Sequence, residues 1–191
     1  MMFLGSKEYT KDLDLVVTCQ NDYNSVIEAL SELNYSSDKP TCGMDRVDLS
    51  DTQIKDRYRI DLFNTKICGQ LQLSDSMKQR AQKRFESEKI TLYSCAAEDI
   101  FLLKSVTERE GDTADCNRLI QSTVNFDWNC LIDEISIQLE SNKGIWITYI
   151  VEKLMDMNFD RRFPNVFDKI YTFEEKYLNK WSEDFEKEHH K

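Results

Sequence analysis

Apolar and polar residues alternate along several stretches of the N-terminal half, a pattern with the period of a β-strand. The clearest stretch is residues 11–19, where Asp12 and Asp14 alternate with leucines before a run of β-branched and apolar residues. Such a run favours a buried strand, with the leucines facing a core. Three more strands are expected, at residues 47–49, 58–63 and 89–94, and residues 67–73 form either a short strand or a loop.

Apolar residues recur at helical spacing elsewhere, mostly in the C-terminal half. Pro40 and Gly43 indicate a loop over residues 36–43, and Gly111 with Asp112 is expected to break a helix that begins near Ala97. Strands with one helix come first and helices follow, which predicts an α+β fold. The expected helices are residues 22–34, 75–85, 97–110, a shorter one ending at 120, 127–139, 144–155 and 164–187.

The two acids of the first strand point to one face, because side chains at positions i and i+2 of a strand share a face. Two carboxylates about 6–7 Å apart repel each other unless a cation lies between them. Hard divalent cations such as Mg²⁺ take carboxylate oxygens as ligands. The pair therefore indicates a metal site. The alternative is a half-exposed edge strand whose polar face is acidic.

A third acid, Asp61, lies between Ile60 and Leu62 in the same phase as Asp14. If its strand lies beside the first one, Asp61 adds a third carboxylate to the same face. The alternative is a lone strand acid that faces solvent.

Composition narrows the choice of function. Among 191 residues, 25 Lys and Arg stand against 35 Asp and Glu, a net charge of −10. A general nucleic-acid coat protein needs a basic surface and is excluded, although a local basic nucleotide pocket is not. There is no long apolar run and no signal-like start, so we expect a cytoplasmic protein without a membrane span.

Histidine and cysteine chemistry is also disfavoured. The two histidines, His189 and His190, lie next to the last residue, and the six cysteines include no C-x-x-C pair. The cysteines are expected to be free thiols, several of them in the core. Any chemistry therefore falls to carboxylate, lysine or arginine side chains.

The chain resembles the nucleotidyltransferase superfamily, whose catalytic domain is polymerase-β-like. The resemblance rests on D-L-D-L, on the later R-I-D-L-F, and on residues 97–115, A-E-D-I-F-L-L-K-S-V-T-E-R-E-G-D-T-A-D. The last stretch is similar to the lysine-helix motif of minimal prokaryotic nucleotidyltransferase-like proteins, including toxins of abortive-infection type IV systems. The residues that match this motif are Glu98, Asp99, Lys104, Arg109, Asp112 and Asp115.

The resemblance implies a small mixed or antiparallel sheet with flanking helices over residues 1–122, and a helical C-terminal region over residues 123–191. It implies that Asp12, Asp14 and Asp61 bind one or two Mg²⁺ ions, with Asp61 bridging them or activating the acceptor hydroxyl. Lys104 would face the triphosphate with help from Arg109, and Asp112 would orient Lys104 or cap the next helix. For Lys104 the alternative is a surface lysine. For Arg109, Asp112 and Asp115 it is a salt-bridge cluster.

One family element is missing from its usual place. The superfamily has a Gly-Gly or Gly-Ser pair on a helix before the acidic strand, and the backbone amides there bind phosphate. Gly5-Ser6 lies too close to Asp12 for that helical segment to fit between them. We therefore expect Gly5 to belong to the turn before the strand, and the phosphate-binding pair to be absent or to lie upstream of Met1.

Two hypotheses follow. The first is a Mg²⁺-dependent enzyme that transfers a nucleotide from a nucleoside triphosphate to a hydroxyl of RNA, protein or a small molecule, with a toxin-like role implied by the resemblance. The second is an inactive protein of the same fold that binds a protein partner, or a second copy of itself, through its C-terminal helices. A purely structural acidic domain would leave the three in-phase acids unexplained.

Overall fold

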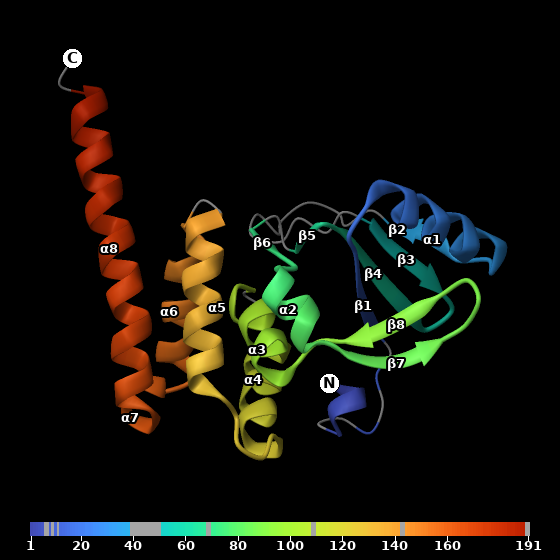
Figure 1. Cartoon of the computed structure of the whole chain (residues 1–191), viewed down its shortest axis with the longest axis horizontal. Coiled ribbons are helices and arrows are strands. Elements are labelled where there is room, and N and C mark those ends of the chain that lie inside the picture. The colour runs from blue at the N-terminus through green and yellow to red at the C-terminus, as the bar shows by residue number, and fades with distance from the viewer. Residues whose placement is uncertain are drawn as a thin grey trace. The chain divides into compact units, whose positions relative to one another are not determined.

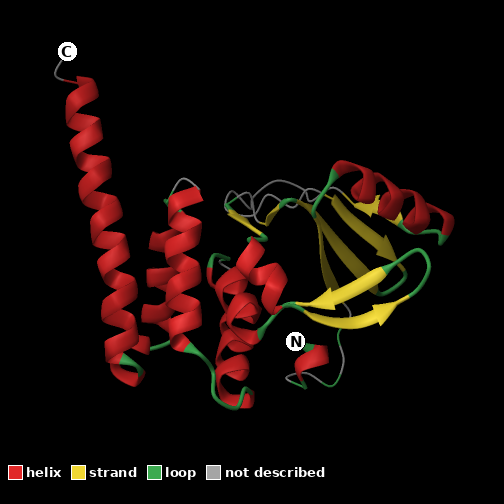
Figure 2. Cartoon of the chain, in the orientation of Figure 1, coloured by secondary structure: helices red, strands yellow, loops and turns green. Residues whose placement is uncertain are grey.

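The structure is a computed structural model of the chain, and it describes residues 1–5, 8, 10, 12–38, 51–67, 70–107, 110–141 and 144–189. The chain divides into two compact units, Met1–Ala96 and Ala97–Lys191. All the strands described lie in the first unit, whereas the second is built from helices (Figures 1 and 2). The protein is therefore an α+β protein, as the order of patterns predicts.

Four strands of the first unit form one mixed sheet in the order β1-β4-β3-β2. The edge strand β1 (Asp12–Val17) runs parallel to β4 (Tyr58–Asn64), and β3 (Asp51–Lys55) is antiparallel to both β4 and β2 (Ser36–Asp38). Parallel neighbours need a long connection. Helix α1 (Gln20–Glu32), β2 and β3 supply it.

The first strand is less buried than its sequence predicts. No residue of β1 is fully buried, and Leu13 keeps 39 % of its surface exposed. The reason is topological: β1 pairs with β4 alone, so it forms the sheet edge. The core instead forms around β4, where Ile60, Leu62 and Phe63 are buried.

Three expectations for the first unit are corrected. Residues 51–55, between the strands expected at 47–49 and 58–63, form strand β3, whose Thr52 and Gln53 are buried in the sheet. The loop expected from residue 36 begins instead with strand β2. Residues 47–49 lie outside the described residues.

The third correction concerns the helix that the sequence predicts over residues 75–85. Helix α2 spans only Asp75–Arg80, and β7 (Gln82–Glu86) follows it and pairs with β8 (Thr91–Ser94). Pairing with β8 decides against the helix, because tertiary context overrides local propensity. The remaining short elements are η1 (Met2–Leu4), β5 (Lys66–Ile67) and β6 (Leu71–Gln72).

The second unit packs its helices around buried apolar side chains, among them Phe101, Leu119, Trp146 and Phe159. An edge-to-face contact joins Phe101 to Trp128, and Phe159 stacks at a tilt against Phe163. The helices are α3 (Ala97–Ser105), α4 (Glu110–Ser122), α5 (Trp128–Ser141), α6 (Trp146–Asp156), α7 (Phe159–Arg162) and α8 (Pro164–His189).

Gly111 and Asp112 do not break a helix. Both lie inside α4, where a glycine costs about 1 kcal/mol relative to alanine and is tolerated. The side chain of Asp112 accepts hydrogen bonds from the side chains of Lys104 and Thr107 in the preceding segment. Packing also groups α3 and α4 with the C-terminal helices, whereas a domain boundary after residue 122 stays a prediction of the resemblance.

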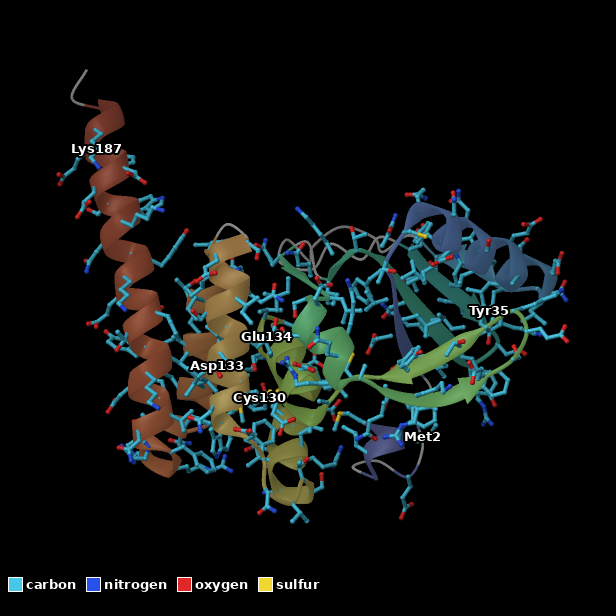
Figure 3. All side chains as sticks on the ribbon, viewed as in Figure 1. Met2, Tyr35, Cys130, Asp133, Glu134 and Lys187 are labelled. Carbon is cyan, nitrogen blue, oxygen red and sulfur yellow. The ribbon has the colours of Figure 1, made fainter. Side chains whose placement is uncertain are left out.

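Polar side chains are also buried in the second unit. On α5, Asp133 is exposed while its neighbour Glu134 is buried and accepts a 3.0 Å hydrogen bond from Gln138 (Figure 3). Within the described part of the chain, no helix combines the length and the apolar character needed to cross a membrane.

Candidate functional site

The acids of the two parallel strands share one face of the sheet. Asp14 of β1 is the register partner of Asp61 on β4, and Asp12 is the partner of Arg59. Register partners on neighbouring strands, about 4.8 Å apart, project to the same side. Asp61 was expected to join the other two acids only if its strand lay beside the first one, and β4 does lie beside β1. We call Asp12, Asp14, Arg59 and Asp61, together with Thr52 of β3, the acidic face.

The three carboxylates differ in their exposure. Asp12 and Asp14 are exposed near the beginning of the edge strand, whereas Asp61 is only 2 % exposed on the central strand. The alternative in which Asp61 faces solvent is therefore wrong. A carboxylate this deeply buried must be hydrogen-bonded to remain ionised.

Asp61 has partners on its own strand and on the next one. From the neighbouring strand the Thr52 hydroxyl, opposite it on β3, donates to Oδ1 at 2.8 Å. From the same strand, Arg59 Nε, two residues earlier on β4, donates to Oδ1 at 2.9 Å and to Oδ2 at 3.1 Å. Arg59 Nη2 also reaches the Thr52 hydroxyl at 3.5 Å, which closes a ring of three side chains.

The chemistry of the acidic face suits a hard divalent cation. Carboxylate oxygens are the preferred ligands of Mg²⁺, and a carboxylate has about four lone-pair sites. The three hydrogen bonds to Asp61 leave it one of these sites, and Asp14 stands directly opposite. The residues therefore fit the implied ion. As the described residues are arranged, however, no group of three or more His, Cys, Asp or Glu side chains could hold a metal ion.

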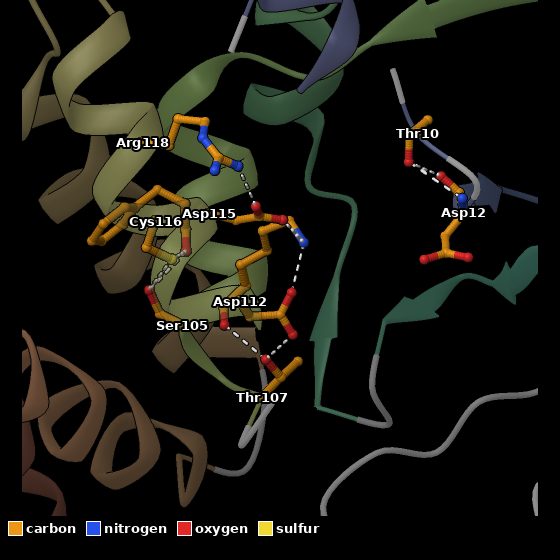
Figure 4. Close-up of polar contacts among 10 residues, drawn as sticks. Thr10, Asp12, Ser105, Thr107, Asp112, Asp115, Cys116 and Arg118 are labelled. Carbon is orange, nitrogen blue, oxygen red and sulfur yellow. Dashed lines mark hydrogen bonds and ion pairs between the residues drawn. The ribbon is translucent and has the colours of Figure 1, made fainter. Parts of the chain in front are cut away.

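A second charged cluster lies in the helical unit, between α3 and α4 (Figure 4). Lys104 Nζ lies 2.6 Å from Asp112 and 3.2 Å from Asp115. Thr107 donates its hydroxyl hydrogen to Asp112 at 2.6 Å, and Arg118 pairs with Asp115 at 3.2 Å. We call these five residues the lysine cluster.

Three charged side chains of the lysine cluster are largely closed to solvent, whereas that of Arg118 is 49 % exposed. The side chain of Asp112 is 5 % exposed, that of Asp115 8 % and that of Lys104 17 %. Lys104 is therefore not a surface lysine, and two aspartates neutralise it. This matches the salt-bridge alternative for Asp112 and Asp115. Arg109, the remaining residue of that alternative, lies outside the described residues.

Two further titratable groups are buried beside this cluster. Burial raises the pKa of the Cys116 thiol to about 12, and a hydrogen bond with Ser105 partly opposes the change. Burial lowers the pKa of Lys153, while Cys116, Asp112 and Asp156 act in the opposite direction. The sequence does not point to Lys153, because a lysine in an amphipathic helix is usually on the side that faces solvent.

The remaining candidate residues have structural positions. Gly5 ends η1 in the left-handed region, with φ of 71°, and so belongs to a turn before β1, as expected; Ser6 lies outside the described residues. Glu98 accepts a hydrogen bond from the backbone amide of Asp127 at 2.8 Å, which ties α3 to the start of α5. Asp99 is buried in the first turn of α3.

The acidic face and the lysine cluster belong to different compact units. The structure thus places Asp12, Asp14 and Asp61 on one face of the sheet of the first unit, and it brings Lys104, Asp112 and Asp115 into contact within the second. Sequence analysis missed Thr52 and Arg59. Strand periodicity could have identified Arg59, because it lies two residues before Asp61 and therefore projects from the same face of the strand.

No protein-family model matches this sequence, and a search of curated proteins finds no match either.

Proposed function

We propose that the protein is a Mg²⁺-dependent nucleotidyltransferase that transfers a nucleotide from a nucleoside triphosphate to a hydroxyl acceptor. The observation that supports this most directly is the pairing of Asp14 with Asp61 across parallel strands, with Asp12 on the same face. Carboxylates that share one face favour the binding of a cation beside them. The resemblance supplies the expectation that this cation is Mg²⁺.

The proposed reaction needs little covalent help from the protein. The acceptor oxygen attacks the α-phosphorus, the bond from that phosphorus to the bridging oxygen breaks, and pyrophosphate leaves with the electron pair. Asp12, Asp14 and Asp61 would hold the cation, which offsets negative charge that develops on phosphate. Asp61 would accept the proton of the attacking hydroxyl, held in position by Thr52.

Triphosphate binding by Lys104 and Arg109 rests on the resemblance alone. In the structure Lys104 is neutralised by Asp112 and Asp115. Either lysine or arginine can bind phosphate, but two carboxylates beside a lysine offset the positive charge that would attract a phosphate. These assignments stay predictions.

A second candidate function is binding of a protein partner without catalysis. One observation favours it: the C-terminal part of α8 exposes large apolar side chains, with Leu178 44 %, Trp181 57 % and Phe185 48 % exposed. Exposed apolar residues that gather on one element are typical of interaction surfaces. A second copy of the chain is one such partner.

Calorimetry with nucleotides distinguishes the two functions. Each of the four ribonucleoside triphosphates is titrated into the protein, with Mg²⁺ and then with a chelator. We expect at least one triphosphate to bind when Mg²⁺ is present. This binding should be lost in the variant Asp12→Asn/Asp14→Asn. The matched control is Glu28→Gln/Glu32→Gln, which removes two exposed charges from α1 of the same unit.

Transfer itself is measured with the nucleotide that binds, labelled at its α-phosphate, and mixed RNA and protein as acceptors. Labelled acceptor that requires both Mg²⁺ and the two aspartates supports the enzyme. Absence of Mg²⁺-dependent binding for all four triphosphates rejects it and favours the partner-binding protein.

A further inference from the structure

Among the residues that define the acidic face, Arg59 has the basic side chain. It contacts Asp61, the carboxylate that a bound Mg²⁺ ion would need as a ligand. Its Nε hydrogen is shared between the two Asp61 oxygens, at 2.9 and 3.1 Å. Asp61 is 2 % exposed, whereas the Arg59 side chain is 37 % exposed. The buried acid is therefore held by a basic group that reaches solvent.

A divalent cation shared by Asp14 and Asp61 would compete with this ion pair. Such a cation must bond at least one Asp61 oxygen, and both oxygens accept from Arg59. The cation and the guanidinium would then lie within a few ångströms of each other, and like charges at that distance repel. Simultaneous binding in the present geometry is therefore unfavourable.

The surroundings let Arg59 leave without moving the acid. Thr52 donates to Asp61 Oδ1 from the neighbouring strand, on the side away from β1, so one hydrogen bond to the carboxylate survives. Arg59 is the second residue of β4, and its long side chain can turn toward solvent by rotamer changes alone. The backbone register of the sheet stays intact.

We propose that Arg59 is a displaceable counter-cation: it neutralises Asp61 while the acidic face holds no metal, and a divalent cation that binds Asp14 and Asp61 displaces it. This proposal rests on the cation site of the proposed function. Its consequence is that Arg59 weakens cation binding. A basic residue of the acidic face would thus set the Mg²⁺ concentration at which the site fills.

The test is calorimetric titration with MgCl₂ alone at low ionic strength, without nucleotide. We expect Arg59→Gln to bind Mg²⁺ at least about tenfold more tightly than the unmodified protein, since one charge-assisted competitor is removed. The matched control is Arg57→Gln, which removes the same charge from an exposed turn residue that stacks on Tyr58. Its affinity should change less than about twofold.

A second measurement needs no variant for its readout. In a ¹⁵N-labelled protein the Arg59 Nε–H signal should shift as Mg²⁺ is added, while the Arg57 signal stays in place. Each signal is assigned by its loss in Arg59→Lys or Arg57→Lys, and Arg59→Lys keeps the charge at position 59 should Arg59→Gln fail to fold.

Several results would overturn the proposal: no Mg²⁺ binding in any of these proteins, an affinity of Arg59→Gln no higher than that of the unmodified protein, or an Arg59 signal that stays unchanged at saturating Mg²⁺. Failure of the proposed function looks different. Tighter Mg²⁺ binding by Arg59→Gln without any nucleotide transfer rejects the enzyme and leaves the displaceable counter-cation standing.

Discussion

The acidic face and the lysine cluster contain the same kinds of side chain in opposite balance. On the acidic face, three aspartates stand against one arginine, and Asp12 and Asp14 are exposed. In the lysine cluster, two buried aspartates stand against Lys104 and Arg118. The first group has more acidic than basic side chains and two exposed acids, whereas in the second both aspartates are buried against two basic side chains, of which Arg118 is 49 % exposed.

The difference separates a candidate ligand site from a structural ion-pair cluster. A cluster of paired acids and bases stabilises packing between helices but offers little to a ligand, because any new partner must first break an existing ion pair. A face with surplus carboxylates attracts a cation and loses little stability when one of its exposed acids is removed. Removing single residues from each group therefore tests the comparison.

The largest effect is expected in the lysine cluster. Asp112→Ala removes the two 2.6 Å contacts that buried Asp112 makes with Lys104 and Thr107, while Lys104 keeps its ion pair with Asp115, and should lower the free energy of unfolding by about 2–3 kcal/mol. Urea denaturation followed by tryptophan fluorescence measures it, since all three tryptophans lie in the helical unit. Glu183→Ala, at the exposed Lys187 pair on α8, is the control and should cost less than about 1 kcal/mol. A loss for Asp112→Ala as small as that of the control contradicts the structural role.

An intermediate effect is expected from pH. The folded pKa of Cys116 is raised to about 12 from 9.0, so above pH 9 the unfolded thiol ionises while the folded one does not. This contribution to stability is present below pH 9 and is lost as pH rises toward 12, by at most about 1.4 kcal/mol per pH unit. The lowered pKa of Lys153 acts in the opposite direction below 10.5.

Comparison of the unmodified protein with Cys116→Ala reports the thiol together with its interaction with Lys153. We expect the stability advantage of the unmodified protein to shrink between pH 8 and pH 10.5 in urea denaturation of the helical unit. An advantage that is constant over this range contradicts the raised pKa.

The smallest effect is expected on the acidic face. Asp12→Asn removes an exposed carboxylate at the beginning of an edge strand and should change the free energy of unfolding by less than about 0.5 kcal/mol. Amide hydrogen exchange of β4 reports the stability of the first unit directly. A loss near that of Asp112→Ala would show that the two groups of acids play the same structural part.

Local pattern predicts the elements that have a strong period of their own. Alternation gives β1, β4 and β8, and helical spacing gives most of the helices of the second unit. It fails where strand pairing decides the structure. Residues 82–86 belong to the helix expected over 75–85 but pair with β8. Residues 51–55 lie between two expected strands but form the strand that pairs with both β4 and β2.

For the candidate site, the sequence by itself determined which acids share a phase along each strand, because alternate residues of a strand always project to one side. Only the tertiary structure decided that β1 lies beside β4, that Asp61 is buried, and that Arg59 and Thr52 hold it. It also decided that Lys104 is paired with aspartates from the next helix. The physical reason is that charge balance and burial depend on residues far apart in sequence, whereas phase depends only on the backbone of one strand.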